Sequence, residues 1–427
     1  MGTEFKSSAS AVPLLESSSL SSTGTASAIQ TLGNIIVSIV GTGILGLPFA
    51  FRIAGWFAGS LGVILAGIAT YYCMLLLVQC RDKQASQELT PETRTYGDLG
   101  YKCMGKIGRF LTEFLIFISQ CGGSVAYLVF IGQNLSSIFK WQDLNLSSII
   151  FLLVPIEIAL SWIGSLSALA PFSIFADVCN VLAMAMVVKE DVEKVLSGEF
   201  KFSDRTAFTS NIGGLPFAGG MAVFCFEGFG MTLALEASMR ERGRFPNLLA
   251  KAFTGITLAY VFFGFSGYMA YGDQTRDIIT LNLPHNWSTI AVQIGLCLGL
   301  VFTFPIMVHP VHEIVEGKLE NSEWYQKLYY DDSGNTTIVG KFGRYVSRSI
   351  LIIVLAFLAS FVPGFGVFAS LVGSTVCALI SFVLPATFHL ILFGPSLHFW
   401  QKALDYCFLV GGLLFAGYGT YNAIVGV

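Results

Sequence analysis

An apolar segment near the start of this chain is interrupted at its centre by residues that weaken helices. Residues 33–56 read GNIIVSIVGTGILGLPFAFRIAGW, and the interrupting residues are Gly41, Thr42, Gly43, Gly46 and Pro48. A segment of this length can cross the ~30 Å hydrocarbon core of a bilayer as a helix. Non-helical backbone is tolerated at that depth only where it is buried in protein or lines a cavity. The segment therefore predicts a membrane helix that is broken around a buried binding site.

The composition supports a membrane protein over the whole length of the chain. Hydrophobic residues make up 54% and charged residues only 12%, whereas soluble domains carry roughly 25% charged residues. We predict an all-α integral membrane protein with eleven transmembrane helices. Their expected positions are 30–53, 56–80, 108–137, 147–165, 171–189, 212–237, 248–271, 288–315, 345–363, 366–392 and 402–424.

The distribution of Lys and Arg predicts the orientation of the chain. These residues are concentrated in segments such as 81–109, 238–251 and 316–348, and cytosolic loops carry an excess of positive charge. This places the amino terminus in the cytosol and the carboxyl terminus on the other side. Residues 1–28 are rich in Ser, Thr and Ala and predict a disordered cytosolic tail, followed by a transmembrane domain over 29–427.

The sixth expected span carries a second interruption. Residues 212–237 contain the run Glu227-Gly228-Phe229-Gly230 at mid-depth. The first and sixth spans each begin a set of five, and an odd number of spans per set inverts one set relative to the other. We therefore expect inverted repeats over about 29–190 and 211–392, with an extra helix at 402–424. Broken helices at matching positions of inverted halves indicate a transporter site, whereas a glycine-rich helix-packing face is the alternative.

Several motifs resemble the amino acid/auxin permease family, and within it the plant transporters of aromatic and neutral amino acids. They are VGTGILGLPFAF in the first span, FCFEGFGM in the sixth, YGDQTRDIITLNLP after the seventh and FPIMVHP in the eighth. The resemblance covers about residues 29–427. It implies a LeuT-type fold with five-plus-five inverted repeats and alternating access. It also implies secondary active transport of neutral and aromatic amino acids, commonly with protons, and some plant members also move auxins. An amino-acid-sensing receptor with little net transport is the alternative, and we expect no enzymatic activity.

A broken helix can bind both charged groups of an amino acid through its backbone. The start of its second half presents free N–H groups to the carboxylate, and the end of its first half presents carbonyl groups to the ammonium. We expect the N–H groups from Thr42, Gly43, Ile44 and Leu45, and the carbonyl edge from Ser38, Val40 and Gly41. The sixth span would contribute Phe224, Cys225, Phe226 and Gly228, and the family resemblance adds Tyr127.

The candidates for proton coupling are titratable residues inside the expected spans. Glu227 is the first, because a carboxylate at mid-membrane costs several kcal/mol unless it is paired or protonated. It could instead cap the interrupted backbone. Asp177 and His309 are further candidates, with helix contacts or packing as their alternatives. In proton-coupled animal relatives a His lies seven residues before the GTG triplet, whereas this chain has Asn34 there.

The remaining expectations concern ligands and location. The nine cysteines form no C-x-x-C pair, so we predict neither a metal site nor a disulfide framework. We expect no cofactor, a proton gradient rather than sodium as the driving force, and amino acids as substrates. The protein should be a monomer in the lipid bilayer of the vacuole or plasma membrane, without a nucleic-acid partner.

Overall fold

The computed structural model describes residues 24–87, 95–139, 145–163, 166–197, 202–320 and 338–425. The regular structure of these residues is helical, and one isolated bridge joins Ala26 and Met239. The α-helices are α1 Ala28–Ile39, α2 Leu47–Ala54, α3 Trp56–Gln87, α4 Tyr96–Ile138, α5 Leu146–Ser161, α6 Leu166–Leu196, α7 Gly214–Cys225, α8 Phe229–Ser238, α9 Phe245–Tyr271, α10 Trp287–Glu320, α12 Ile338–Ser360, α13 Phe365–Val372, α14 Leu384–Phe393 and α15 Phe399–Val425. Short 3₁₀ turns are η1 Thr42–Gly46, η3 Phe202–Asp204, η4 Arg242–Arg244, η5 Gly272–Gln274 and η6 Ile279–Asn282, and π-helical turns are η7 Gly373–Cys377 and η8 Leu379–Val383.

The described helices are long and apolar enough for a multi-pass membrane protein. Nine described helical segments could each cross a membrane by length and composition, two of them being Gly214–Ser238 (α7 with α8) and Phe365–Phe393 (α13 to α14). The bent pair formed by α1 and the segment Thr42–Ala54 makes a tenth. Helix α5 is apolar but has 16 residues, fewer than the ~20 that a membrane helix needs. The all-helical architecture is as predicted, whereas the count of eleven spans stays a prediction.

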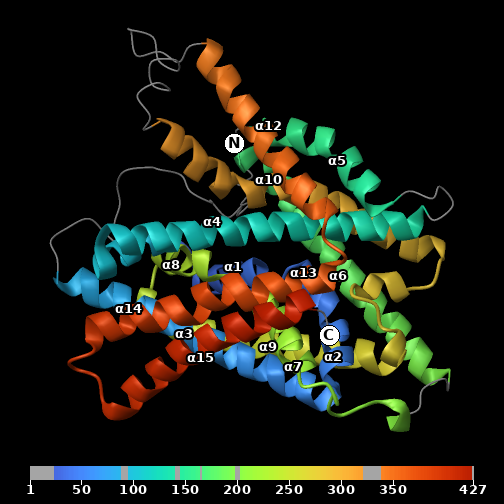
Figure 1. Cartoon of the computed structure of the whole chain (residues 1–427), viewed down its shortest axis with the longest axis horizontal. Helices are drawn as coiled ribbons and strands as arrows, with labels where there is room; N and C mark the ends of the chain where they lie inside the picture. The colour runs from blue at the N-terminus through green and yellow to red at the C-terminus, as the bar shows by residue number, and fades with distance from the viewer. Residues whose placement is uncertain are drawn as a thin grey trace, which may run out of the picture.

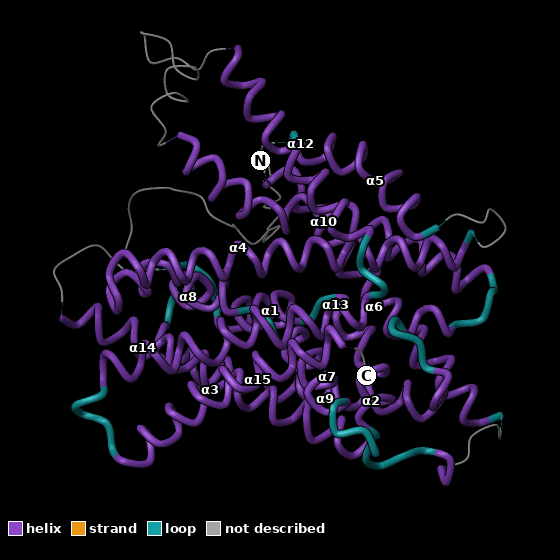
Figure 2. The backbone as a smooth tube through the Cα atoms, in the orientation of Figure 1, coloured by secondary structure: helices purple, strands orange, loops and turns teal. Residues whose placement is uncertain are grey.

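The long helix α4 runs between two groups of helices (Figure 1). On one side, α5, α10 and α12 pack against α4 and against one another. On the other side, α3 and α9 pack together and enclose α2 and α7. Figure 2 shows the described backbone as helices and loops. The contacts therefore separate the first, second, sixth and seventh spans from the third, fourth, eighth and ninth.

The third span begins earlier than predicted. Helix α4 begins at Tyr96, twelve residues before the expected start at 108, and Gly105 bends it with a φ of 66°. A positive φ is accessible to glycine because it has no Cβ, so the polar stretch before Gly105 continues as helix in a new direction. The tenth span is one continuous helix over Phe365–Phe393, as expected, with the π-helical turns η7 and η8 between α13 and α14.

Candidate functional site

The first span is broken where the sequence predicts it. Helix α1 ends at Ile39, and Val40 and Gly41 are extended, with φ, ψ values of −79°, 91° and −111°, −166°. The 3₁₀ turn η1 then leads into α2, and the two parts of the span are bent by 44°. The last carbonyl groups of α1 and the first N–H groups of η1 lie at this gap, where a regular helix would leave them without intrahelical partners. Of these, the Ile36 and Ile39 carbonyls accept from the N–H groups of Val40 and Gly41.

The break in the sixth span begins one residue before the Glu227–Gly230 run and ends two residues before the end of that run. Helix α7 ends at Cys225, and α8 begins at Phe229, so only Phe226, Glu227 and Gly228 lie outside the helices. Gly230 is helical and exposed. The Glu227 N–H bonds the Phe224 carbonyl at 3.3 Å. The gap is therefore short, and it presents the carboxyl end of α7 and the amino end of α8.

The two breaks are in direct contact. A Cβ atom added to Gly43 would lie 3.1 Å from Sγ of Cys225 and 3.5 Å from the Phe224 ring. A Cβ atom on Gly228 would lie 3.1 Å from Cγ1 of Ile39. A glycine at each break therefore packs against the helix end at the other break. The structure thus brings together the two interrupted spans that the sequence predicts to form one site.

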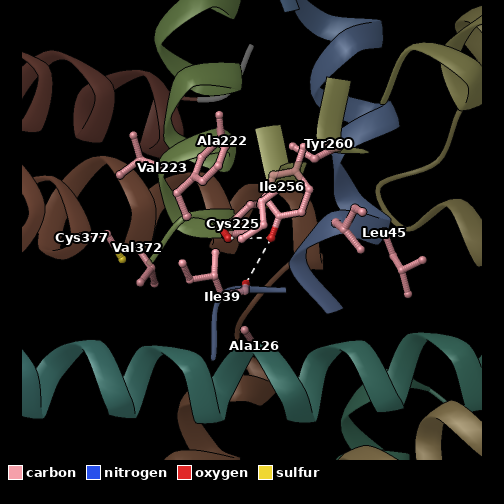
Figure 3. Packing of buried hydrophobic residues seen from close by; sticks show 14 of the residues in the cluster. Ile39, Leu45, Ala126, Ala222, Val223, Cys225, Ile256, Tyr260, Val372 and Cys377 are labelled. Carbon is pink, nitrogen blue, oxygen red and sulfur yellow. Dashed lines mark hydrogen bonds between the residues drawn. The ribbon is translucent and has the colours of Figure 1, made fainter. Parts of the chain in front are cut away.

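The hydroxyl of Tyr260 connects the two breaks and was not predicted. It lies 3.1 Å from the Ile39 carbonyl oxygen and 3.0 Å from the Cys225 carbonyl oxygen, as the dashed lines in Figure 3 show. Ile39 is the last residue of α1 and Cys225 the last of α7. Tyr260 lies in α9 within the apolar run TLAYVFF, which carries no local pattern that could have identified it.

The structure distinguishes the two phenylalanines of the sixth span. Phe226 is fully buried, and its ring contacts the rings of Phe253 and Tyr260 in α9 at centroid distances of 5.9 and 5.0 Å. Phe224 is half-buried beside Gly43 and approaches Phe365 of α13 edge-on. Phe224 is thus the ring at the contact between the breaks, and Phe226 is part of the core behind it.

The predicted backbone groups of the first span differ in how far they are already paired. Thr42 and Gly43 are the first residues of η1, where N–H groups lack partners in the turn. The N–H of Ile44 is directed at the Gly41 carbonyl at 3.5 Å, and Leu45 lies further along the turn. Thr42 and Gly43 are therefore the better donors for a carboxylate.

On the carbonyl side, the groups that lie at the gap are not all those expected. The Ser38 hydroxyl bonds the Ile35 carbonyl of its own helix at 2.9 Å. The Val40 N–H bonds Ile36 and so closes the last turn of α1. The Ile39 carbonyl, absent from the prediction, is the one that meets Tyr260.

A narrow crevice leads to the breaks. It has a volume of about 10 Å³ and is lined by Ile35, Ser38, Ile39, Met74, Gly228, Thr232, Leu235, Phe245 and Leu249. A cavity needs roughly 10–15 Å³ to hold one water molecule. An amino acid does not fit this crevice, so binding requires the surrounding helices to separate.

Among the proton-coupling candidates, Glu227 lies at the break itself. It is half-buried, and its carboxylate has the N–H of Phe229, the first residue of α8, as a hydrogen-bond partner. This contact is the one that a structural cap makes, and it also places an ionisable group between the halves of the span. Both roles predicted from the sequence therefore stay open for Glu227.

The other candidates lie away from the contact between the breaks. Asp177 of α6 is close enough to Tyr127 of α4 for its charge to act on the Tyr127 hydroxyl. His309 of α10 lies 3.7 Å from Glu313 on the same helix. Groups of His, Cys, Asp and Glu that could hold a metal ion are absent among the described residues.

A polar network joins the segment after α9 to both groups of helices. Gln133 of α4 donates to the Asp277 carboxylate at 2.9 Å and accepts from the Phe365 N–H at 3.1 Å. Arg52 of α2 donates to the Thr275 carbonyl at 2.8 Å. These bonds connect α2, α4 and α13 through the segment after α9.

A buried ion pair lies at the carboxyl end of α8. Arg81 of α3 contacts Glu236, and the two side chains are only 6% and 2% exposed. Next to it, the Ala26 N–H donates to the Ser238 carbonyl at 3.0 Å, and the Arg240 N–H donates to the Ala26 carbonyl at 3.0 Å. Residues before α1 thus pair with the segment after α8, which ties the two broken spans together a second time.

The helices and paired breaks define a multi-pass membrane protein of the LeuT-type fold. The structure resembles the inward-facing conformation of Mhp1, with a TM-score of 0.58 and 12% identity, covering 94% of this chain and 90% of that one. The family described as transmembrane amino acid transporter protein matches residues 24–425. The chain belongs to this family, whose members are transporters and not enzymes.

Two curated relatives span most of this chain. The amino acid transporter ANT1 of Arabidopsis thaliana is 68% identical over 420 residues, covering 98% of this chain and 97% of the relative. The vacuolar amino acid transporter 4 of Saccharomyces cerevisiae is 28% identical over 436 residues, covering 95% of this chain and 59% of the relative.

Proposed function

We propose that the chain carries neutral and aromatic amino acids across a membrane by alternating access, with the two breaks as the substrate site. The observation that carries the proposal is the contact between Gly43 and the end of α7 at Cys225. It sets the N–H groups of η1 beside the carbonyl end of α7. The carboxylate of an amino acid would bind the N–H groups of Thr42 and Gly43, and its ammonium would face the carbonyl groups.

The side-chain pocket would lie on the side of the breaks where Phe224 stands. Phe224 is half-buried there, near Phe365 of α13. Aromatic rings pair favourably with each other at centroid distances of ~4.5–7 Å, so these rings suit the side chain of Phe or Tyr. Tyr127, near Asp177, would bound the path from the side of α4.

The transport cycle would move one group of helices against the other. The spans that contain α1 to α3 and α7 to α9 would rock against α4, α5, α10 and α12, which pack together. The Gln133–Asp277 bonds, which join α4 to the segment after α9, would open on one side of the membrane. The Arg81–Glu236 pair joins α3 to α8 within the moving group and would stay intact on the other side. With the amino terminus in the cytosol, the Arg81 side is cytosolic.

The driving force in this proposal is a proton gradient, with Glu227 as the proton carrier at the break, and the protein acts as a monomer in the vacuolar or plasma membrane. The name of the yeast relative, a vacuolar transporter, favours the vacuole. Thr303, a possible sodium ligand by position, bonds the Gly299 and Leu300 carbonyls of its own helix at 3.1 and 3.2 Å, which agrees with a sodium-independent site.

The test is uptake by the purified chain in proteoliposomes. Labelled Phe should enter saturably, and an imposed proton gradient should drive it above equilibrium, with sodium and choline media giving equal rates. Empty liposomes and competition by unlabelled Tyr serve as controls. Saturable binding without flux would contradict transport and indicate an amino acid sensor.

A further inference from the structure

The Tyr260 hydroxyl lies where two helix ends converge. The carbonyl groups at the carboxyl end of a helix lack intrahelical partners and carry partial negative charge. Here the last carbonyls of α1 and α7, those of Ile39 and Cys225, both lie within 3.1 Å of the Tyr260 oxygen, and the Ile39 carbonyl also accepts from the Gly41 N–H at 3.0 Å. Two such ends at one buried point repel each other unless a positive group lies between them. A metal cation, a substrate ammonium or an O–H hydrogen can fill that role.

The position of this hydroxyl is fixed by packing. Tyr260 has no exposed surface, and its ring contacts the ring of Phe226 at 5.0 Å. It comes from α9, a third element that belongs to neither broken span. The hydroxyl therefore holds its place independently of the two half-helices that it joins.

Among the described residues, the two other fully buried tyrosines make a different kind of contact. Tyr96 donates to the Ile380 carbonyl, and the Tyr268 hydroxyl bonds the N–H and hydroxyl of Thr206 in a loop. Each of these joins its helix to a single segment. The Tyr260 hydroxyl joins its helix to two segments at once. Its partners, Ile39 and Cys225, are each the last helical residue before a break.

We propose that Tyr260 is a positioning residue for the substrate site. Its hydroxyl supplies the positive end of a dipole to both helix ends, so the two breaks keep their relative geometry before the substrate binds. A hydroxyl has one hydrogen and is shared between the two carbonyls, which leaves acceptor capacity at the gap for the substrate ammonium. The site is thereby organised without a metal cation at this point. This inference rests on the proposed transport function.

The test compares three side chains at position 260 in the full-length protein in proteoliposomes. Tyr260→Phe keeps the ring and removes the hydroxyl, and it should raise the KM for labelled Phe about tenfold while Vmax changes less than about threefold. p-Aminophenylalanine, placed at 260 by codon suppression, has two N–H hydrogens for the two carbonyls. It should restore the KM to within about threefold of the wild type. Tyr268→Phe, in the same helix and equally buried, is the matched control and should leave the KM unchanged.

The results separate positioning from packing. A KM for Tyr260→Phe within twofold of the wild type would overturn the inference, as would an equal rise in Tyr268→Phe. If the Tyr260→Phe protein does not reach the membrane, the variant with p-aminophenylalanine at 260 is the test. A KM of that variant more than tenfold above the wild-type value would then overturn the inference. Absence of flux in the wild type would contradict the proposed function instead, and the same comparison is then made with dissociation constants for Phe.

Discussion

Gly43 and Cys225 are in contact where the two broken spans are interrupted: a Cβ atom on Gly43 would lie 3.1 Å from the Cys225 sulfur. Contacts of 3.1 Å require the neighbour to shift, and the neighbour here is part of the end of α7. Gly43 therefore matters because of the space that it leaves between the breaks.

Gly43→Val should abolish amino acid binding and leave the protein inserted in the membrane. The isopropyl group would push the breaks apart and fill the approach to the η1 N–H groups. Uptake of labelled Phe should fall at least tenfold. Gly230→Ala is the control, because a Cβ there meets nothing within 4 Å and Ala favours a helix. Normal uptake by Gly43→Val would refute the assignment of the site to this contact.

Glu227→Gln should separate exchange from accumulation. The amide keeps the size of the side chain and can still accept from the Phe229 N–H, but it cannot release a proton. Exchange of labelled Phe across proteoliposomes should stay within about threefold of the wild type, while accumulation driven by an imposed proton gradient should be lost. Loss of both activities together would instead assign Glu227 the structural role of a cap. Glu241→Gln, at an exposed position, is the control.

The first break could be predicted from the sequence because its cause is local. Glycines at positions 41 and 43 weaken a helix wherever they stand in it, and the observed gap after Ile39 coincides with them. The second break is displaced, because Gly230 is compatible with the first turn of α8 and the gap ends before it. The glycines in the sequence indicate approximately where a span is broken. Packing against the neighbouring span then determines which residues lie outside the helices.

The features that prediction missed depend on contacts between distant segments. Tyr260 lies 221 residues from Ile39 and 35 from Cys225, and nothing near it in the sequence marks it. The different positions of Phe224 and Phe226 could likewise not be predicted, because they depend on which of the two rings packs against α9. The start of α4 at Tyr96 was missed because the stretch before Gly105 is too polar for a membrane span, although Thr95 and Asp98 form a capping box there.

Gln133→Ala should loosen the segment that follows α9. Gln133 both donates to Asp277 and accepts from the Phe365 N–H, and a hydrogen bond to a charged group contributes about 1.5–3 kcal/mol. Amide hydrogen exchange over residues 272–284 should be at least tenfold faster than in the wild type. Exchange in α12, which lies in the other group of helices, is the internal control. Unchanged amide exchange over 272–284 would show that the hydrogen bonds of Gln133 do not hold this segment in place.

Arg81→Met should destabilise the protein by leaving Glu236 buried without its partner. Breaking one side of a buried pair costs about 3–5 kcal/mol, whereas replacing both members with apolar groups is often neutral. The Tm in detergent should fall by several degrees in the single variant and recover in Arg81→Met with Glu236→Leu. Loss of the ion pair between Arg81 and Asp82 should cost little stability, because the Asp82 side chain is 63% exposed. A double variant as unstable as the single one would contradict this account.

The central claim, that the two breaks form the amino acid site, is tested most directly by a cryo-EM map of the chain with bound Phe. The account predicts ligand density between η1 and the end of α7, with the carboxylate within hydrogen-bonding distance of the Thr42 and Gly43 N–H groups. The ammonium should face the Ile39 and Cys225 carbonyls beside the Tyr260 hydroxyl. Density for the ligand elsewhere, with Gly43 still packed against Cys225, would contradict it.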